Sequence, residues 1–297
     1  HVDINSNIYY SYNTAIYKVT GLNSAQLIAG DPLILGNVDN NIIGHGSDAR
    51  FYAISGLTSD LFGNIYFITQ SGPFNELSGR IKKIVPSTQI VTTVYEKSNG
   101  TLAGLCFDNN ANFIFCEDGK IYKLNAFSGQ KTFVAGQALL NFGTTNIDGN
   151  GNQAMFGSIS DIEYNNTTNE IVVTEGITIQ SLMALLTTGQ QVEKTVVRII
   201  KSSNDVVTIA GGELGFADAV GMDASFAGLI RFVINSSGEL FITDRFNHLI
   251  RKLAYVPYTP PAPTYINTTP NLCLGSTVNQ QPAISGSETH LQIKTDS

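Results

Sequence analysis

One short phrase recurs five times along this chain of 297 residues, and it constrains the fold more than any other feature. Each copy has an apolar run, a polar turn, a second run that begins with Asn or Glu, another turn, and a third run with apolar residues three apart. The second run is written NIYYSY, NIYFIT, NFIFCE, EIVVTE and ELFITD, at residues 7–12, 64–69, 112–117, 170–175 and 239–244. Short apolar runs bounded by polar or Gly-rich turns are typical of antiparallel strands. The chain therefore predicts repeated groups of strands.

Two further phrases accompany the copies. A fourth run ends in Ala-Gly, as in LIAG, FVAG and TIAG at residues 27–30, 133–136 and 208–211. The spacing G-x-x-A-x-F precedes three copies, at residues 46–51, 151–156 and 221–226. An Asp precedes each of these three, namely Asp39, Asp148 and Asp218, and we interpret Asp148 and Asp218 as turn residues. Identical spacing in several places is a mark of internal repetition.

The repeat predicts the architecture. One four-stranded unit of ~40–50 residues, a length typical of propeller blades, cannot cover both of its faces. Copies arranged around an axis bury each face against a neighbour. We therefore predict an all-β protein, a β-propeller of about five four-stranded blades over residues 1–256, with six blades if the tail or another chain completes one. An open sandwich is the alternative for any series of short strands, but it does not require one phrase to recur.

The motif Asn247-His248-Leu249, inside DRFNHLIRKL, resembles the signature of the NHL-repeat family of β-propellers. The TIAG and G-x-x-A-x-F phrases extend this resemblance over about residues 3–253. The resemblance implies NHL-like blades and a binding role, although partners within the family vary too widely to be transferred. Some propellers of this kind are enzymes with zinc or calcium in the central channel. A channel-centred metal-dependent lyase or hydrolase is therefore an alternative function.

The character of the chain changes after residue 256. Five of its nine prolines lie in residues 257–270, and Pro cannot sit in a central strand, so this segment is expected to be a stiff linker. Residues 271–297 are expected to be a tail, a fragment of a further β-module, or an arm that docks on another subunit. The insertion at residues 176–195 is expected to form a short helix or a hairpin, either as a contact surface or packed on its own blade.

Charge and motif spacing argue against several functions. The net charge is −7 and Lys and Arg form no stripe, so we expect no nucleic-acid binding. No apolar run reaches 18 residues, so we expect no membrane insertion. The four histidines lack the spacing of a zinc site. Asp148-Gly-Asn150-Gly-Asn152 resembles the start of a calcium loop, but its sixth and twelfth positions are Gln153 and Ile159 rather than Gly and Glu. We expect no catalytic residues, no metal and no cofactor.

Cysteines and glycosylation sequons bear on the compartment. Cys106 and Cys116 fall on neighbouring predicted strands, where Cys106 faces Ile114 and Cys116 is a diagonal neighbour at ~7–8 Å. That separation is larger than a disulfide normally spans. A shift of register would shorten it, so a disulfide between Cys106 and Cys116 stays an alternative. Sequons begin in predicted turns or linkers, where a glycan would be exposed, at Asn99, Asn165, Asn166, Asn235 and Asn267. A chain rich in Asn, Ser and Thr also produces sequons by composition alone.

Only 14% of the residues are charged, against ~25% in an average soluble domain. Together with turn-rich repeats and a Pro/Thr linker, this favours an extracellular or cell-surface protein. The features as a whole predict a non-catalytic propeller that serves as a structural or protein-interaction module, with another protein or copies of itself as partner, in a larger extracellular assembly or fibre. A carbohydrate-binding propeller is a further alternative. The absence of Trp weakens it, although Tyr and Phe can stack on sugars.

Overall fold

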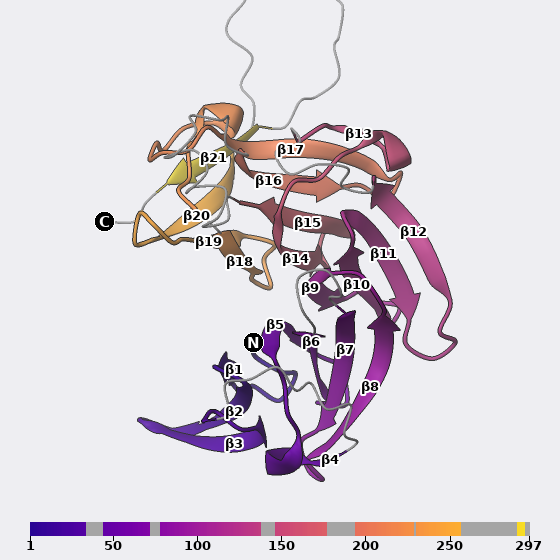
Figure 1. Ribbon diagram of the computed structural model, residues 1–297. Coiled ribbons are helices and arrows are strands. Elements are labelled where there is room, and N and C mark those ends of the chain that lie inside the picture. The colour runs from indigo at the N-terminus through magenta and orange to yellow at the C-terminus, as the bar shows by residue number, and fades with distance from the viewer. Residues whose placement is uncertain are drawn as a thin grey trace, which may run out of the picture.

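A computed structural model describes residues 1–33, 44–71, 78–137, 146–176, 194–228, 230–256 and 290–294. The strands of these residues form five antiparallel sheets that follow one another in an arc (Figure 1). This arrangement confirms the predicted all-β propeller of five blades. The sheets are named blades 1 to 5 in chain order.

Each blade is a meander in which consecutive strands pair. Blade 1 consists of β1 (Tyr9–Tyr12), β2 (Ala15–Gly21) and β3 (Ser24–Gly30). Blade 2 consists of β5 (Ala53–Ser59), β6 (Ile65–Ser71), β7 (Ser78–Val85) and β8 (Ile90–Lys97), with β4 (Gly44–His45) outside β8. Blade 3 consists of β9 (Leu102–Phe107), β10 (Asn112–Glu117), β11 (Lys120–Asn125) and β12 (Lys131–Gly136).

The last two blades follow the same plan. Blade 4 consists of β14 (Ile159–Asn165), β15 (Glu170–Glu175), β16 (Thr195–Ile200) and β17 (Asp205–Gly212), with β13 (Gly149–Asn150) outside β17. Blade 5 consists of β18 (Ile230–Ile234), β19 (Leu240–Asp244), β20 (Leu249–Val256) and β21 (His290–Lys294). The run HLQIK of the predicted tail is therefore the fourth strand of blade 5. Most of the insertion at residues 176–195, and Asp39, lie outside the described residues.

The first strands of blades 2 to 5 lie side by side, since β5 contacts β9, β9 contacts β14, and β14 contacts β18. Blade 1 lacks a full first strand, and only the bridge between Val2 and Ile8 occupies its place. The arc is open between blade 5 and blade 1 (Figure 1). No helix of the described residues is long and apolar enough to cross a bilayer.

The hydrophobic core is divided into four clusters, one between each pair of consecutive blades. Along the second strand of blade 2, for example, Ile65 and Phe67 pack toward blade 1, while Tyr66 and Ile68 pack toward blade 3. This alternation follows from the two-residue period of a β-strand, which sends successive side chains to opposite faces. Each blade therefore contributes one face to each neighbour.

The G-x-x-A-x-F phrases form three short 3-10 helices that contact β3, β12 and β17 of the preceding blades: η1 (Gly46–Asp48), η2 (Gly151–Gln153) and η3 (Gly221–Asp223). The Phe of each phrase is buried against the Gly of the Ala-Gly phrase in the preceding blade. A Cβ on Gly136, whose φ is 102°, would lie 2.9 Å from the Phe156 ring. Only Gly tolerates both that conformation and that approach. The Ala-Gly phrase and the G-x-x-A-x-F phrase are thus the two halves of one contact.

A carboxylate or amide side chain organises the turn between the first and second strands. Asp3 Oδ1 accepts hydrogen bonds from the backbone N–H groups of Asn5 and Asn7, at 2.9 and 2.8 Å. The same turn is built around Asp60, Asp108 and Asn235. Asp and Asn favour such turns because their side chains bond the backbone two or more residues ahead.

Candidate interaction site

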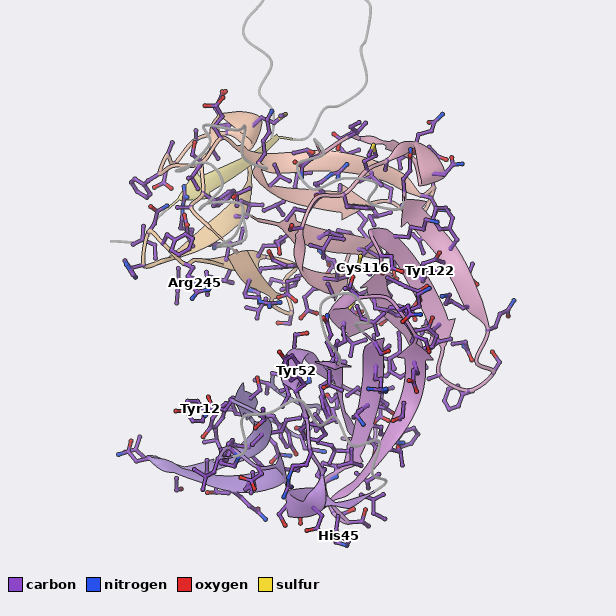
Figure 2. All side chains as sticks on the ribbon, viewed as in Figure 1. Tyr12, His45, Tyr52, Cys116, Tyr122 and Arg245 are labelled. Carbon is purple, nitrogen blue, oxygen red and sulfur yellow. The ribbon has the colours of Figure 1, made fainter. Side chains whose placement is uncertain are left out.

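The candidate interaction site is the open side of the arc, where the described blades stop burying each other's faces. In Figure 2 the opening is flanked by Tyr12, on blade 1, and by Arg245, which follows β19 of blade 5. At some repeat positions, the side chain is exposed on blade 1 or on blade 5 but is buried in the remaining four blades. Equivalent positions in the repeat allow a direct comparison.

On blade 1, the exposed side chains come from the second strand of the repeat. Tyr10 is 41% exposed, whereas the residues at the same position of blades 2 to 5 are fully buried or nearly so. Those residues are Phe67, Phe115, Val173 and Ile242. The neighbouring Tyr12 is 61% exposed, and Tyr10 stacks on Tyr17 of β2 with the ring centroids 5.3 Å apart. The free face of blade 1 is therefore an aromatic surface without a covering blade.

On blade 5, the exposed side chains lie on the opposite face. Ile250 is 70% exposed, whereas the residue at its position is fully buried in each of the other four blades. Those residues are Ile16, Ile81, Ile121 and Val197. Val233 of β18 is 60% exposed, and it pairs with Phe241 across the ladder. The free face of blade 5 is the one that would meet a following blade.

Two cations border the free face of blade 5. Arg231 is half-exposed, and its guanidinium lies 3.6 Å from the Asp161 carboxylate of blade 4 and donates to the carbonyl of Ser160. Lys252 Nζ lies 2.6 Å from Glu239 Oε1 and 5.9 Å from the centroid of the Phe241 ring. The Asp161 carboxylate is largely buried, so its pair with Arg231 differs from an exposed one, whereas the partly exposed pair of Lys252 and Glu239 contributes little stability.

Two acidic side chains of β14 lie beside the axis. Burial, and then the charge of Asp161, raise the pKa of Glu163 to about 8. Burial also raises the pKa of Asp161, although Arg231 opposes that shift. Across the axis, His1 Nε2 lies 2.7 Å from Ser59 Oγ of β5. Among the described residues, no group of three or more His, Cys, Asp or Glu side chains is placed to hold a metal ion.

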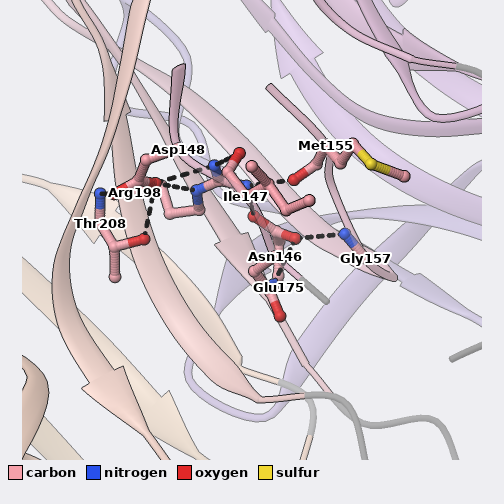
Figure 3. A network of polar contacts seen from close by, with 8 residues as sticks. All are labelled: Asn146, Ile147, Asp148, Met155, Gly157, Glu175, Arg198 and Thr208. Carbon is pink, nitrogen blue, oxygen red and sulfur yellow. Dashed lines mark hydrogen bonds and ion pairs between the residues drawn. The ribbon is translucent and has the colours of Figure 1, made fainter. Parts of the chain in front are cut away.

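Two buried arginines hold blades 4 and 5 to the lead-in segments before them. Arg198 of β16 donates to Glu175 Oε1 at 2.9 Å, to Asp148 Oδ1 at 2.9 Å, and to the carbonyls of Ile147 and Met155 (Figure 3). Arg251 of β20 makes the same set of contacts with Asp244, Asp218, Ala217 and Ser225. Asp148 and Asp218 are thus ion-pair partners, and our interpretation of them as simple turn residues was incomplete.

Blade 1 has no such ionic contact, because Tyr17 stands at the position of the arginine and Tyr12 at that of the second-strand carboxylate. The signal for the contact was present in the sequence. Arg198 and Arg251 share one repeat position, and each occurs together with an acidic residue at the end of the second strand.

Two side chains of the string Asp148-Gly-Asn150-Gly-Asn152 are engaged by other groups of blade 4. Asp148 also accepts bonds from the N–H and hydroxyl of Thr208, both at 2.9 Å. Asn150 Nδ2 donates to Asp205 Oδ1 at 2.8 Å. These side chains serve the structure of blade 4.

Cys106 and Cys116 are both free and buried. The predicted register is correct, since Phe107 faces Phe113 and Cys106 faces Ile114. A shift of the ladder between Phe115 and Cys116 then places Cys116 opposite Ala103, so the two thiols do not bridge. Burial raises the pKa of the Cys116 thiol to about 12.

The sequons differ in exposure. Asn99, Asn166 and Asn235 are exposed, whereas Asn165 is buried, contrary to our expectation. The reason is structural: Asn165 Oδ1 accepts hydrogen bonds from the N–H groups of Thr167 and Thr168, at 2.9 and 3.3 Å. Asn267 lies outside the described residues.

A hollow of about 470 Å³ lies between the edge of blade 2 and the β11–β12 turn of blade 3. Its lining includes Val94, Tyr95, Phe113, Leu124, Phe127 and Lys131. Phe127, at the turn, is 81% exposed. Lys131 Nζ donates to Glu117 Oε2 at 2.7 Å, so the charge at this end of the hollow is neutralised.

The fold places the chain among β-propeller proteins. No family model matches it, and no curated protein matches it in sequence. Its fold is similar to the crystal structure of an auxiliary nutrient binding protein from Bacteroides thetaiotaomicron, with 14% identity and a TM-score of 0.55 over 85% of this chain and 57% of that chain. The corresponding protein from Bacteroides ovatus gives 15% identity and a TM-score of 0.54, over 85% of this chain and 67% of that one.

The chain therefore spans a little over half the length of the first of these proteins. At such identities the similarity shows the fold alone. A weaker similarity, with a TM-score of 0.41 and 8% identity, covers 84% of this chain and 62% of an oligogalacturonate lyase in complex with manganese. That value is too low to support an argument about activity.

Proposed function

We propose that this propeller is a non-catalytic binding module of a secreted or cell-surface protein, and that it holds a protein partner at the open side of the arc. The observation that carries this proposal is the exposure of Ile250, at a position where the other four blades bury the side chain completely. Apolar side chains that gather on one surface mark an interaction site more often than scattered ones do.

The free faces have the composition of an interface. Tyr10, Tyr12 and Tyr17 supply large side chains that lose little conformational entropy on binding, and Tyr is enriched at protein–protein contacts. Arg231 and Lys252, each paired with a carboxylate, border the opposite wall with charged groups, which favours a specific orientation of the partner.

Exposed sequons support an extracellular location. Asn99, Asn166 and Asn235 lie on the surface, where N-linked glycans can be accommodated. The two similar structures from Bacteroides are described as nutrient binding proteins, which agrees with a binding role for this fold.

Site-specific photo-crosslinking in the source cells tests this function. A photoreactive amino acid is placed at Tyr12 or Val233, on the two sides of the opening, and at Leu61, which is even more exposed but lies in the β5–β6 turn. We expect discrete protein adducts from Tyr12 and Val233 and none from Leu61. Equal labelling at all three positions, or no adduct at the opening, contradicts the proposal. Stoichiometric zinc or calcium in the purified protein would instead favour a channel-centred lyase or hydrolase.

The hollow beside Phe127 favours a second candidate function, the binding of a small carbohydrate. An exposed ring at the edge of a hollow with a neutralised charge suits the apolar face of a sugar. Isothermal titration with neutral oligosaccharides tests this candidate. We expect binding by the native chain that is lost in F127A and retained in the opening variant Y12S. Equal heats for the native chain and F127A contradict it.

A further inference from the structure

We infer that the opening between blades 5 and 1 takes one additional β-blade of the same repeat type, which packs one face on blade 5 and the other on blade 1. This inference rests on the proposed function, since it names the partner of the same surface. It is drawn from the repeat itself, because the chain contains four complete examples of the contact that the two free faces lack.

The first step concerns the matching of faces. We call the face that a blade turns toward the next blade along the chain its forward face, and the face that it turns toward the previous blade its backward face. Each of the four core clusters joins a forward face to the backward face of the next blade. Ile250 and Val233 belong to a forward face, and Tyr10 and Tyr12 belong to a backward face. The opening therefore has a forward face on one side and a backward face on the other. One blade of this repeat can pack on both, because it has one face of each kind.

The second step concerns the wall on blade 5. Val233, Phe241 and Lys252 form one row across the strands of its free face. In the contact between blades 3 and 4, Lys123 stands at the repeat position of Lys252, and its Nζ lies 5.6 Å from the centroid of the Tyr164 ring on the first strand of the next blade. The inserted blade is accordingly expected to offer an apolar or aromatic first strand to Lys252.

The third step concerns the wall on blade 1. In the contact between blades 1 and 2, Phe67 of the backward face packs with Ile16 and Ile28 of blade 1. Tyr10 holds the position of Phe67, so it requires a similar apolar face from the inserted blade. The stacked pair of Tyr10 and Tyr17 has no buried arginine beneath it, so this wall can be covered without stranding a charge.

A second copy of this chain fits the opening poorly. Suppose that blade 1 of a second copy packs on blade 5 of the first copy in the way that consecutive blades pack. Blade 2 of the second copy would then occupy the position of blade 1 of the first copy. A single blade meets no such obstacle. The occupant is therefore one blade rather than a second arc.

A fusion protein tests this inference. A copy of residues 98–136, which contain blade 3 without any long insertion, is joined by a short linker before His1. The matched control carries a Gly/Ser extension of the same length. We expect the added blade to raise the Tm by about 5 °C or more and to lower the fluorescence of bound ANS by about twofold or more, because it covers both free faces. The Gly/Ser extension is expected to change neither.

Two double variants locate the effect. Y10S/Y12S and V233S/I250S change exposed side chains, so each is expected to leave the Tm of the unfused chain nearly unchanged. In the fused chain each is expected to remove most of the gain. A gain that survives both variants overturns the inference, since the added blade would then act elsewhere.

A second fusion covers the case in which the copy of blade 3 does not fold when it is joined before His1. It carries residues 146–212, which contain blade 4 with its lead-in phrase. Failure of both fusions to raise the Tm overturns the inference. So does a native chain that is dimeric in light scattering and is dissociated by Y10S/Y12S, because the faces would then be covered by a second copy. Crosslinks from Tyr12 and Val233 in either case would still leave the proposed function standing.

Discussion

Gly211 and Phe226 touch across the contact between blades 4 and 5, and a Cβ on Gly211 would lie 3.1 Å from the Phe226 ring and 2.3 Å from the Thr195 carbonyl oxygen. Gly211 also has a φ of 93°, which L-residues rarely adopt. The same relationship links Gly30 to Phe51 and Gly136 to Phe156. Three of the four blade contacts thus depend on a glycine that closes one blade and a phenylalanine that introduces the next.

The first prediction is that G211A destabilises the protein by about 2–4 kcal/mol, as the sum of backbone strain and forced displacement of the ring or the carbonyl. Gly129 provides the matched control, because its φ is 68° but a Cβ there meets nothing within 4 Å. G129A is therefore expected to cost only the strain, about 1–2 kcal/mol. Chemical denaturation of the two variants measures the difference, and equal losses would show that close packing at Gly211 contributes nothing.

The second prediction concerns Arg198, whose side chain is fully buried between Glu175 and Asp148. R198M leaves the two carboxylates facing each other without a cation, so we expect a loss of about 3–5 kcal/mol in the free energy of unfolding. R231M removes a half-exposed arginine whose partner Asp161 is largely buried, so it is expected to cost less than R198M, about 1–2 kcal/mol. Denaturant midpoints of both variants check this ranking, and a similar small loss in each would be evidence against the ionic contact as a structural element.

The third prediction concerns pH. The pKa of Glu163 in the folded protein, about 8, lies above its ordinary value, so the folded state holds a proton that the unfolded chain has released. Stability from this group is therefore present at acid pH and is lost as the pH rises from about 5 through 8. E163Q is expected to flatten the fall of Tm over that range, whereas E213Q, at an exposed position, should retain it. Parallel Tm curves for the native chain and E163Q would contradict the shift.

The fourth prediction distinguishes two overlapping sequons. Expressed through a glycosylating secretory pathway, the folded protein is expected to carry a glycan on Asn166 and not on Asn165, because Asn165 is buried in its own turn. T167A removes the sequon of Asn165 and keeps that of Asn166, while T168A does the reverse. Mass spectrometry of glycopeptides should find the modification in T167A and lose it in T168A. A glycan on Asn165 in T168A would refute the assignment.

The repeat made much of the fold predictable. The five second strands, the register of Phe107 with Phe113, and the division into five blades all follow from a two-residue period and recurrent turn residues. Features that depend on distant partners did not follow. The pairing of β21 with β20 joins segments separated by more than 30 residues, which no local pattern encodes.

The site shows the same limit. The ladder shift at Cys116 is a local irregularity with no sequence signature, and it decides that the two cysteines do not meet. The tyrosines at positions 10, 12 and 17 looked like ordinary strand residues. Their significance emerges only when their exposure is compared with that of the equivalent buried residues in the other blades, because exposure is a property of the arrangement of blades.

The opening between the first and last described blades has a consequence for how the isolated chain unfolds. The core clusters of the described residues join only consecutive blades, so the arc behaves as a short one-dimensional array whose terminal units have one packed neighbour and whose inner units have two. Amide exchange should therefore be fastest in blades 1 and 5 and slowest in blade 3, and the array should fray inward from both ends. If both terminal faces were covered by an added blade, the blades would form a closed circle. Every blade would then have two neighbours and equal protection from exchange.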